Sequence, residues 1–374
     1  MPKILFITTV ARTLTSFLLP HAQLLRAKGW QVEALAQGAA ADPQCQLAFD
    51  RVYEASLTRN PLNLGALLRA SRFITQLVES RGYQLVHVHT PIAAAIARWG
   101  LRRLQRERKL RLLYTAHGFH FYRGAPLLNW LLYYPVERFL APYTDYLLTM
   151  NSEDYERART LPGPQVFKVP GVGIDVGRFQ QAGDPYYLHR ELNLPPQTSI
   201  LLSIGELSKR KNHQLVLRAL AKLTQRPWAY AICGSGPLAE KLKAQAQSLG
   251  LESRVHFLGQ RKDIPALLQS TSLFLFPSLQ EGLPVALMEA MAASRAAVCS
   301  AIRGNIDLLD HGYGGYLCPS PSPASWAQAI NTLLEEPALR ERMGQYNAHK
   351  VAAYDLRQVL PQMEAIYERA AQSL

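Results

Sequence analysis

The chain has 374 residues, of which 48% are hydrophobic, and a formal net charge of +13 at pH 7. This length exceeds that of a usual single core and predicts two domains, while the apolar fraction argues against a disordered chain. The four cysteines are widely spaced and form no Cys-x-x-Cys pair, so they indicate neither a disulfide framework nor a zinc site and fit a reducing compartment.

The amino-terminal residues indicate neither a signal peptide nor a membrane span. Residues 1–10 contain one lysine and an apolar run that is too short for a signal peptide and has no cleavage site, so we expect a first strand there. No uninterrupted apolar run reaches the length that spans a bilayer. We therefore expect a cytoplasmic protein whose membrane contact, if any, is peripheral and at the inner face.

The first half alternates short apolar β-rich runs with longer helical patterns, which predicts a mostly parallel sheet with helices on both faces. The expected strands are Lys3–Thr8, Gln31–Ala36, Gln84–His89, Arg111–Thr115 and Asp145–Met150. The expected helices are Thr15–Lys28, Leu62–Arg81, Pro91–Arg108, Pro126–Leu140 and Ser152–Thr160. Ligands of such sheets bind beyond the carboxyl ends of the strands, and here these ends are rich in hydroxyls and histidines.

A segment dense in proline and glycine, Val169–Pro185, predicts the connection between two domains. The alternation then restarts with expected strands at Ile200–Ile204, Trp228–Cys233, Val255–Leu258, Ser272–Phe276 and Ala296–Ser300. Expected helices lie at Asn212–Leu223, Leu238–Leu249, Ile264–Gln269, from Pro284 onward, and at Pro323–Glu335, Leu339–Tyr354 and Leu356–Ala371. We therefore predict an α/β fold of two doubly wound, Rossmann-like domains that face a cleft.

The stretch Pro277–Ala290 is the predicted chemical centre. It places Glu281 in a loop before a helix that begins near Pro284, and Glu289 near the second turn of that helix. Backbone N–H groups at the helix start and two carboxylates suit an anion that carries hydroxyls, as in a nucleotide-sugar. A surface loop with a solvated glutamate is the plain alternative.

Two further loops follow directly on expected strands of the second domain. The segment Gly205–His213 contains Lys209, Arg210 and Lys211, and such clustered cations suit a diphosphate, although a solvated basic turn has the same appearance. The pair Gly234 and Gly236 lets backbone approach a ligand closely, but a bare Gly-x-Gly is a weak signal. The loops carry more weight together than singly.

Histidines mark the strand ends of the first domain. His117 follows an expected strand and suits a hydrogen bond to a sugar hydroxyl or a phosphate, or simply to backbone. His87 and His89 share one strand face, but no third ligand is apparent nearby, so a metal site is disfavoured.

The positive charge lies mainly in the first half. Residues 1–183 carry 22 basic and 12 acidic side chains, a net +10, whereas residues 184–374 carry 19 and 16, a net +3. This asymmetry predicts an acidic partner for the first half. Residues 98–111 hold seven cations and one acid, interleaved with apolar residues, and Leu127–Leu140 is strongly apolar. These segments fit peripheral membrane contact, or equally a solvated face and a core helix.

Together these residues resemble the retaining glycosyltransferases of family four, which have the GT-B fold, and in particular the bacterial capsule and exopolysaccharide branch. The motifs that carry the resemblance are Thr115–His120, Pro170–Asp175, Gly205–His213, Gly234–Pro237 and Glu281–Glu289. It implies an acceptor-side domain at 1–175, a nucleotide-sugar-binding domain at 176–354 and a helix at 355–374 that packs back on the first domain.

The resemblance also implies roles for individual residues. Glu281 and His117 would contact the donor sugar, Glu289 the ribose, and Lys211 the diphosphate, with backbone contacts expected from Gly282, Leu283 and Val285. The implied reaction is metal-independent, uses no cofactor, and retains the anomeric configuration, with UDP expected ahead of GDP in the donor. The expected acceptor is lipid-linked or a polysaccharide.

The chain departs from the family pattern at three places. Glu206 stands where the family commonly has arginine, so that phosphate cation is supplied by Lys209 or Arg210, or not at all. Leu283-Pro284 replaces a common Phe-Gly, and Pro284 removes one backbone donor. Residues 8–13 lack the usual glycine-rich loop.

Two other readings remain at this point. A nucleotide-sugar epimerase can share this architecture and would form product without an acceptor. A non-catalytic basic protein would bind membrane or nucleic acid in a salt-dependent way without stabilisation by nucleotide diphosphates. Nucleic acid is disfavoured because no recognised binding motif is visible.

Overall fold

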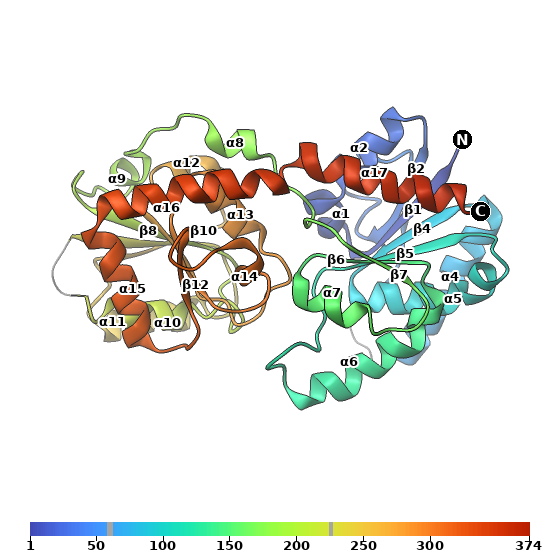
Figure 1. Ribbon diagram of the computed structural model, residues 1–374, viewed down its shortest axis with the longest axis horizontal. Coiled ribbons are helices and arrows are strands. Elements are labelled where there is room, and N and C mark those ends of the chain that lie inside the picture. Colours follow the sequence, from blue (N-terminus) through green and yellow to red (C-terminus); the bar gives the residue numbers. More distant parts are fainter. Residues whose placement is uncertain (58–62, 224–226) are drawn as a thin grey trace. The chain divides into compact units, whose positions relative to one another are not determined.

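The computed structural model describes residues 1–57, 63–223 and 227–374 of the chain (Figure 1). Contacts within the chain divide it into two compact units. Unit 1 is Met1–Gly173 with Leu356–Leu374, and unit 2 is Ile174–Asp355. Each unit contains a parallel sheet covered by helices.

The sheet of unit 1 has the strand order β3-β2-β1-β4-β5-β6-β7. Its strands are β1 Lys3–Val10, β2 Gln31–Gln37, β3 Arg51–Glu54, β4 Leu85–His89, β5 Arg111–Ala116, β6 Tyr146–Thr149 and β7 Gln165–Lys168. Its helices are α1 Ala11–Phe17, α2 Leu19–Ala27, α3 Pro43–Ala48, α4 Leu64–Arg81, α5 Pro91–Arg106, α6 Leu127–Leu140, η1 Ala141–Tyr143, α7 Ser152–Ala158 and α17 Leu356–Gln372.

Apolar residues on both faces of the central strands explain this layered arrangement. The β1 residues from Ile4 to Ile7 are fully buried, as expected for a parallel strand covered on both sides. Helices α4 and α5 pack against each other, and α17 packs against α2 (Figure 1). The chain order reverses between β1 and β4, which creates a topological switch point at their carboxyl ends.

The sheet of unit 2 has the strand order β10-β9-β8-β11-β12-β13. Its strands are β8 Ser199–Ile204, β9 Trp228–Cys233, β10 Val255–Gly259, β11 Leu273–Phe276, β12 Ala297–Ser300 and β13 Gly315–Cys318. Its helices are α8 Val176–Gln180, α9 Tyr187–Glu191, α10 His213–Leu220, α11 Ala239–Ser248, α12 Ile264–Gln269, α13 Val285–Ala292, α14 Asn305–Leu308, α15 Pro323–Glu335, α16 Pro337–Lys350 and η2 Val351–Tyr354. The switch point of this sheet lies between β8 and β11.

The strands that the sequence did not predict are edge strands. β3 and β7 form the two edges of the first sheet, and β13 forms one edge of the second. Each has four residues, and in β3 and β7 the first and last residues are exposed and charged or polar. Because an edge strand pairs on one side only, it needs no continuous apolar run, and its sequence gives little signal.

One expected helix is divided in two. The pattern over residues 15–28 predicts a single helix, but the structure has α1 and α2, with Leu18 between them. Pro20 lies in the first turn of α2, where its missing N–H leaves no hydrogen bond unmade. A continuous helix would place Pro20 in the interior, where its ring collides with the preceding turn.

Candidate active site

The predicted chemical centre lies at the switch point of unit 2. The segment after β8, residues 205–212, and the segment after β11, residues 277–284, leave the sheet at adjacent strand ends. A backbone hydrogen bond of 2.8 Å from Leu279 N to Arg210 O joins the two segments. The sequence motifs on these segments are therefore brought together by the order of the strands.

Lys211 and Arg210 converge on Glu281. The Lys211 Nζ donates to Glu281 Oε1 at 2.7 Å, and one guanidinium nitrogen of Arg210 reaches the same oxygen at 2.9 Å. Arg210 also donates to the Gln280 carbonyl at 3.1 Å. Two cations and one carboxylate thus meet beyond the carboxyl ends of β8 and β11, and the three groups carry a net positive charge.

Burial shapes the chemistry of Lys211. Its side chain is 11% exposed, its Nζ lies 4.5 Å from the ring centre of Phe276, and Glu281 is 10% exposed. Burial lowers the pKa of Lys211, and the adjacent Glu281 carboxylate opposes this shift. A nearly buried ammonium with one carboxylate partner has hydrogen-bonding capacity left for an anionic ligand, since Lys carries three donors.

Helix α13 begins directly after the loop that carries Glu281. Pro284 is its N-cap, so Val285 is the first helical residue, and Leu283 is buried beside it. Glu289 lies in the second turn, where burial raises the pKa of its carboxyl to about 7, partly offset by the positive charge of Arg178 on α8. Glu289 therefore changes charge near neutral pH. Arg178 has no sequence signal that links it to the loop, because only the packing of α8 on α13 brings it near.

Close backbone contacts explain the glycines that follow β8 and β9. A Cβ on Gly234 would lie 1.9 Å from the Gly205 carbonyl oxygen, and one on Gly236 would lie 2.6 Å from the Leu207 oxygen. The Leu207 N–H donates to the Ser235 carbonyl at 3.0 Å. The glycines thus let two strand ends touch, and their first role here is to fit the segments together.

A buried polar network lies beneath the cation-bearing segment. The Tyr230 hydroxyl donates to Ser203 Oγ at 2.8 Å, and Ser203 donates to the Leu275 carbonyl at 2.6 Å, which links β9, β8 and β11. His213 packs on the same hydroxyl at 3.4 Å, and burial lowers its pKa to about 4. Asn212, with φ of 52°, adopts the left-handed conformation that asparagine tolerates best among residues with a side chain. The network fixes the backbone that positions Lys211.

In unit 1, His117 belongs to a histidine cluster in which it is half-buried, whereas His21, His87 and His89 are buried. His89 Nδ1 lies 3.0 Å from His117 Nε2, and His87 bonds to Tyr367 and Thr115 at 2.9 Å and 2.8 Å. Burial lowers the pKa of His117 and His21 to about 4 and lowers those of His87 and His89 well below their usual value. Within the described residues no group of His, Cys, Asp and Glu is placed to hold a metal ion. The cluster is a set of neutral imidazoles.

The structure brings together part of the predicted site. Arg210, Lys211 and Glu281 are in contact, and Gly282, Leu283, Val285 and Glu289 continue the same loop and helix. Gly234 and Gly236 follow the neighbouring strand β9, and Lys209 is exposed on the segment before Arg210. His117 belongs to unit 1, whereas the other predicted site residues belong to unit 2.

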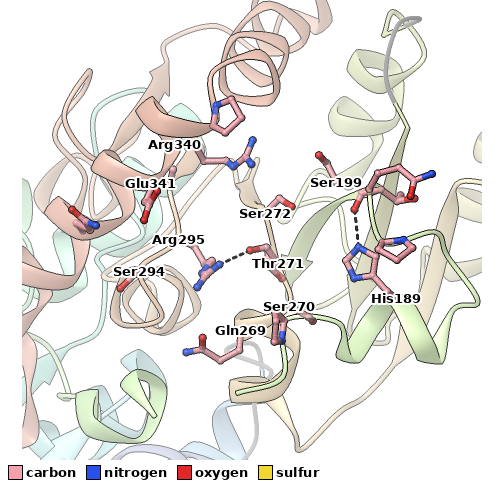
Figure 2. Close-up of a pocket in the computed structure, with 17 residues that line it drawn as sticks. His189, Ser199, Gln269, Ser270, Thr271, Ser272, Ser294, Arg295, Arg340 and Glu341 are labelled. Atoms are coloured by element: carbon pink, nitrogen blue, oxygen red, sulfur yellow. Dashed lines mark hydrogen bonds between the residues drawn. The ribbon is translucent and has the colours of Figure 1, made fainter. Parts of the chain in front are cut away.

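A large cavity of unit 2 lies at the amino ends of the strands, opposite the carboxyl ends that carry the candidate site (Figure 2). It measures about 620 Å³ and is lined by Ser199, Ser272 and Ala296, which stand at the amino ends of β8, β11 and β12, together with Arg295 and Arg340. Arg295 donates to the Thr271 carbonyl at 2.8 Å, as Figure 2 shows. Because ligands of doubly wound sheets bind at the carboxyl ends, this cavity is separate from the candidate site.

Comparisons with known proteins cover almost the entire chain. Residues 187–350 match the family model described as glycosyl transferases group 1, and residues 16–169 match a glycosyl transferase 4-like domain. A Bacillus subtilis protein that carries the provisional name glycosyltransferase EpsD is 32% identical over 372 residues, or 98% of this chain and 96% of its own. The chain belongs to the group 1 glycosyltransferases.

Solved structures give this group 1 glycosyltransferase the GT-B fold. HepE of Anabaena, determined with UDP and glucose, superposes with a TM-score of 0.81 at 20% identity and covers 98% of this chain and all of HepE. The lipopolysaccharide glycosyltransferase WaaG superposes with a TM-score of 0.75 at 18% identity, over 97% of this chain and 99% of WaaG. The predicted fold class, two doubly wound domains of GT-B type, and the predicted family are thus confirmed.

A relative of this group 1 glycosyltransferase from Escherichia coli has a name that states its donor and its acceptor. It is the UDP-Gal:α-D-GlcNAc-diphosphoundecaprenol α-1,3-galactosyltransferase, which is 26% identical over 272 residues, covering 71% of this chain and 70% of its own. The name gives that enzyme a UDP-sugar donor and a lipid diphosphate acceptor. In the described part of this chain, no helix is both long and apolar enough to cross a membrane.

Proposed function

We propose that this glycosyltransferase moves a sugar from a nucleotide-diphosphate donor to a lipid-linked or polysaccharide acceptor in the synthesis of cell-surface polysaccharide. The observation that carries the proposal is the meeting of Lys211, Arg210 and Glu281 at the switch point of unit 2. Their combined positive charge suits a diphosphate, and their position is where doubly wound sheets bind nucleotides.

We propose that the nucleotide of the donor is UDP in preference to GDP. The Escherichia coli relative is named for a UDP-sugar, and the similar HepE structure holds UDP and glucose. In this proposal Lys211 binds the diphosphate with Lys209 and Arg210, Glu289 accepts hydrogen bonds from the ribose hydroxyls, and backbone near α13 contributes through Gly282, Leu283 and Val285. Gly234 and Gly236 allow the backbone to approach the nucleotide.

The proposed reaction retains the anomeric configuration and uses no metal. The bond between the anomeric carbon and the β-phosphate oxygen breaks, and a bond to the acceptor oxygen forms on the same face of the sugar. The acceptor hydroxyl passes its proton to the departing diphosphate. Lys211 and Arg210 stabilise the negative charge that develops on that leaving group, while Glu281 and His117 orient the sugar.

The acceptor side of the proposal involves a membrane surface. A lipid diphosphate is anionic and held in the bilayer, and the excess of basic residues in the first half of the chain would favour its approach. On this basis we place the enzyme at the inner face of the cell membrane, attached peripherally through unit 1.

The donor part is tested first in solution. Thermal unfolding with UDP, GDP and ADP should show stabilisation by UDP that exceeds that by the other two, because bound ligand stabilises only the folded state. Transfer from the matching UDP-sugars to a lipid diphosphate acceptor follows. Lys211→Ala and Glu281→Ala should each reduce transfer at least about a hundredfold, the loss typical of a removed electrostatic contact. Lys243→Ala, an exposed lysine on α11, is the matched control and should leave transfer unchanged.

Three outcomes would contradict the proposal. The first is near-normal transfer in both the Lys211 and the Glu281 variants, with the fold intact. The second is a product formed without any acceptor, which would indicate an epimerase. The third is salt-dependent binding to nucleic acid without stabilisation by any nucleotide diphosphate.

A further inference from the structure

Helix α6 is apolar on both of its faces. Its inner face packs on unit 1 through Trp130, Tyr133 and Tyr134, which lie against the buried core. Its outer face exposes Leu127, Leu128, Leu131, Leu132, Val136 and Phe139, with exposed fractions from 45% to 81%. A helix that is apolar all round is normally buried, so the outer face of α6 indicates a partner.

The inner face holds α6 firmly on unit 1. Glu137 forms a buried ion pair of 2.8 Å with Arg98 of α5, and Arg98 lies over the Tyr114 ring at 4.4 Å. Tyr134 packs edge-on against Phe121 at 5.3 Å. The exposed leucines therefore belong to a helix that is docked in place, and Figure 1 shows α6 at the margin of its unit.

Aromatic and basic side chains border the outer face of α6. Trp99 lies 5.8 Å from Phe139, and the Arg102 guanidinium stacks on Trp99 at 3.9 Å. Phe139 also contacts Tyr143 at 6.3 Å, and Arg106 lies over that ring at 4.9 Å. Aromatic rings flanked by arginines, next to a row of leucines, form the composition that suits the boundary between lipid headgroups and acyl chains.

The charges favour a bilayer over a second copy of the chain. Arg138 is the exposed charge on α6 itself, since Glu137 is buried, and exposed Arg106 adds positive charge beside Tyr143. Two copies joined through this face would bring like charges together, which opposes association, whereas anionic headgroups attract them. Fourteen residues of helix span about 21 Å, less than the roughly 30 Å apolar core of a bilayer, so α6 would lie in the plane of the interface.

We propose that the outer face of α6 is a membrane-docking surface for bilayers that contain anionic lipid. Its leucines and Phe139 enter the boundary of the acyl chains, and Arg102 and Arg106 contact the headgroups. The inference rests on the proposed function and deepens it, since a membrane-held acceptor would be met at this surface.

Vesicle flotation of the full chain tests the proposal. The protein should float with phosphatidylcholine vesicles that contain phosphatidylglycerol and bind vesicles of phosphatidylcholine alone more weakly. Leu127→Glu with Leu131→Glu should reduce the partition coefficient by at least about a hundredfold, because each fully buried leucine contributes roughly tenfold. Leu47→Glu is the matched control, since Leu47 is an equally exposed leucine on α3 of the same unit and should leave flotation unchanged.

A second pair of variants isolates the electrostatic contribution. Arg102→Gln with Arg106→Gln should weaken binding to the anionic vesicles and reduce its salt dependence, while binding to neutral vesicles stays as weak as before. Failure of the wild-type chain to float would overturn the proposal, as would full flotation of the double glutamate variant. Dimerisation in light scattering that the glutamate variant abolishes, without flotation, would instead identify a second copy as the partner.

The outcome is separable from that of the proposed function. UDP stabilisation is measured in solution and depends on unit 2, so the α6 variants should keep it in full. Loss of flotation with intact UDP stabilisation would support the docking surface alone. Flotation without stabilisation by any nucleotide would support the surface and contradict the proposed donor.

Discussion

At the scale of single residues, the site combines groups that are costly to bury. Lys211 and Glu281 are each about nine-tenths buried, and such pairs add little net stability because the loss of hydration offsets their attraction. Their arrangement is better explained by binding than by folding. Glu289 fits the same pattern, because its raised pKa reports an acid held where ionisation is unfavourable.

The Lys211 and Glu281 pair allows stability and function to be separated. Glu281→Gln should lower the free energy of unfolding by about 2 kcal/mol, because it leaves Lys211 without its carboxylate in a nearly buried position. Lys211→Met combined with Glu281→Leu should recover most of that loss and still lack transfer activity. Urea denaturation and transfer assays on the single and double variants measure both effects. A double variant that regains activity would show that the pair serves only the fold.

Glu289 should make stability fall as pH rises towards neutrality. The unfolded carboxyl ionises near pH 4.5 and the folded one near pH 7, so between these values the folded state holds a proton that the unfolded state has lost. Glu289→Gln removes this dependence. The free energy of unfolding of the variant, relative to that of wild type, should rise by about 2–3 kcal/mol from pH 5 to pH 8, as measured by urea denaturation. The variant should also lose affinity for UDP. Glu240→Gln, at an exposed position of α11, should gain nothing. A gain for Glu289→Gln that is equal at both pH values would refute the raised pKa.

At the scale of elements, the site depends on how strand ends fit together. The segments after β8 and β9 touch at Gly205 and Gly234, and the segment after β11 bonds to that after β8 through Leu279. The Gly304 backbone approaches the Gly282 carbonyl in the same way, since a Cβ on Gly304 would lie 2.3 Å from that oxygen. Small residues thus occur where backbones meet, and the candidate site residues lie on the same segments.

Gly234→Ala should disturb the site through the backbone. Its Cβ would lie 1.9 Å from the Gly205 oxygen, so the strand end must shift. We expect a loss of about 2–4 kcal/mol of stability, in the range of strong single-site effects, and weaker binding of UDP. Gly65→Ala in α4 is the control, because its Cβ meets only the end of the Arg69 side chain at 3.5 Å and should be neutral or slightly stabilising. Equal melting temperatures for the two variants would contradict the close approach.

At the scale of the whole molecule, the two units differ in the ionisable groups that they contain. Unit 2 carries the cation and carboxylate site, and unit 1 carries the histidine cluster under α17, where Tyr367 bonds His87. Histidines with lowered pKa values stay neutral in the fold but accept protons in the unfolded chain below about pH 6.5. The unfolded state therefore binds more protons on acidification, and stability falls as pH drops from 6.5 towards 4.

Replacing one histidine tests this linkage. His87→Gln can keep hydrogen bonds to Tyr367 and Thr115 but cannot titrate. The variant should be less stable than wild type at pH 7.5, and its stability should decline less steeply between pH 6 and pH 5, by about 1.4 kcal/mol per pH unit. Urea denaturation at four pH values provides the slopes. Parallel slopes for variant and wild type would exclude His87 from the acid response.

The sequence by itself determined the family, the α/β alternation and the central strands, because these depend on local periodicity and on motifs at strand ends. It also predicted that Lys211 follows a strand and that Glu281 lies in the loop between a strand and a helix, which is where the structure has them. Only the tertiary structure decided that both cations meet Glu281, that Arg178 is near enough for its charge to act on Glu289, and that Leu127–Leu140 exposes one apolar face. A helix that is apolar all round has no periodic signal to distinguish its inner from its outer face. Contacts between residues 70 positions apart depend on strand order, which no local pattern encodes.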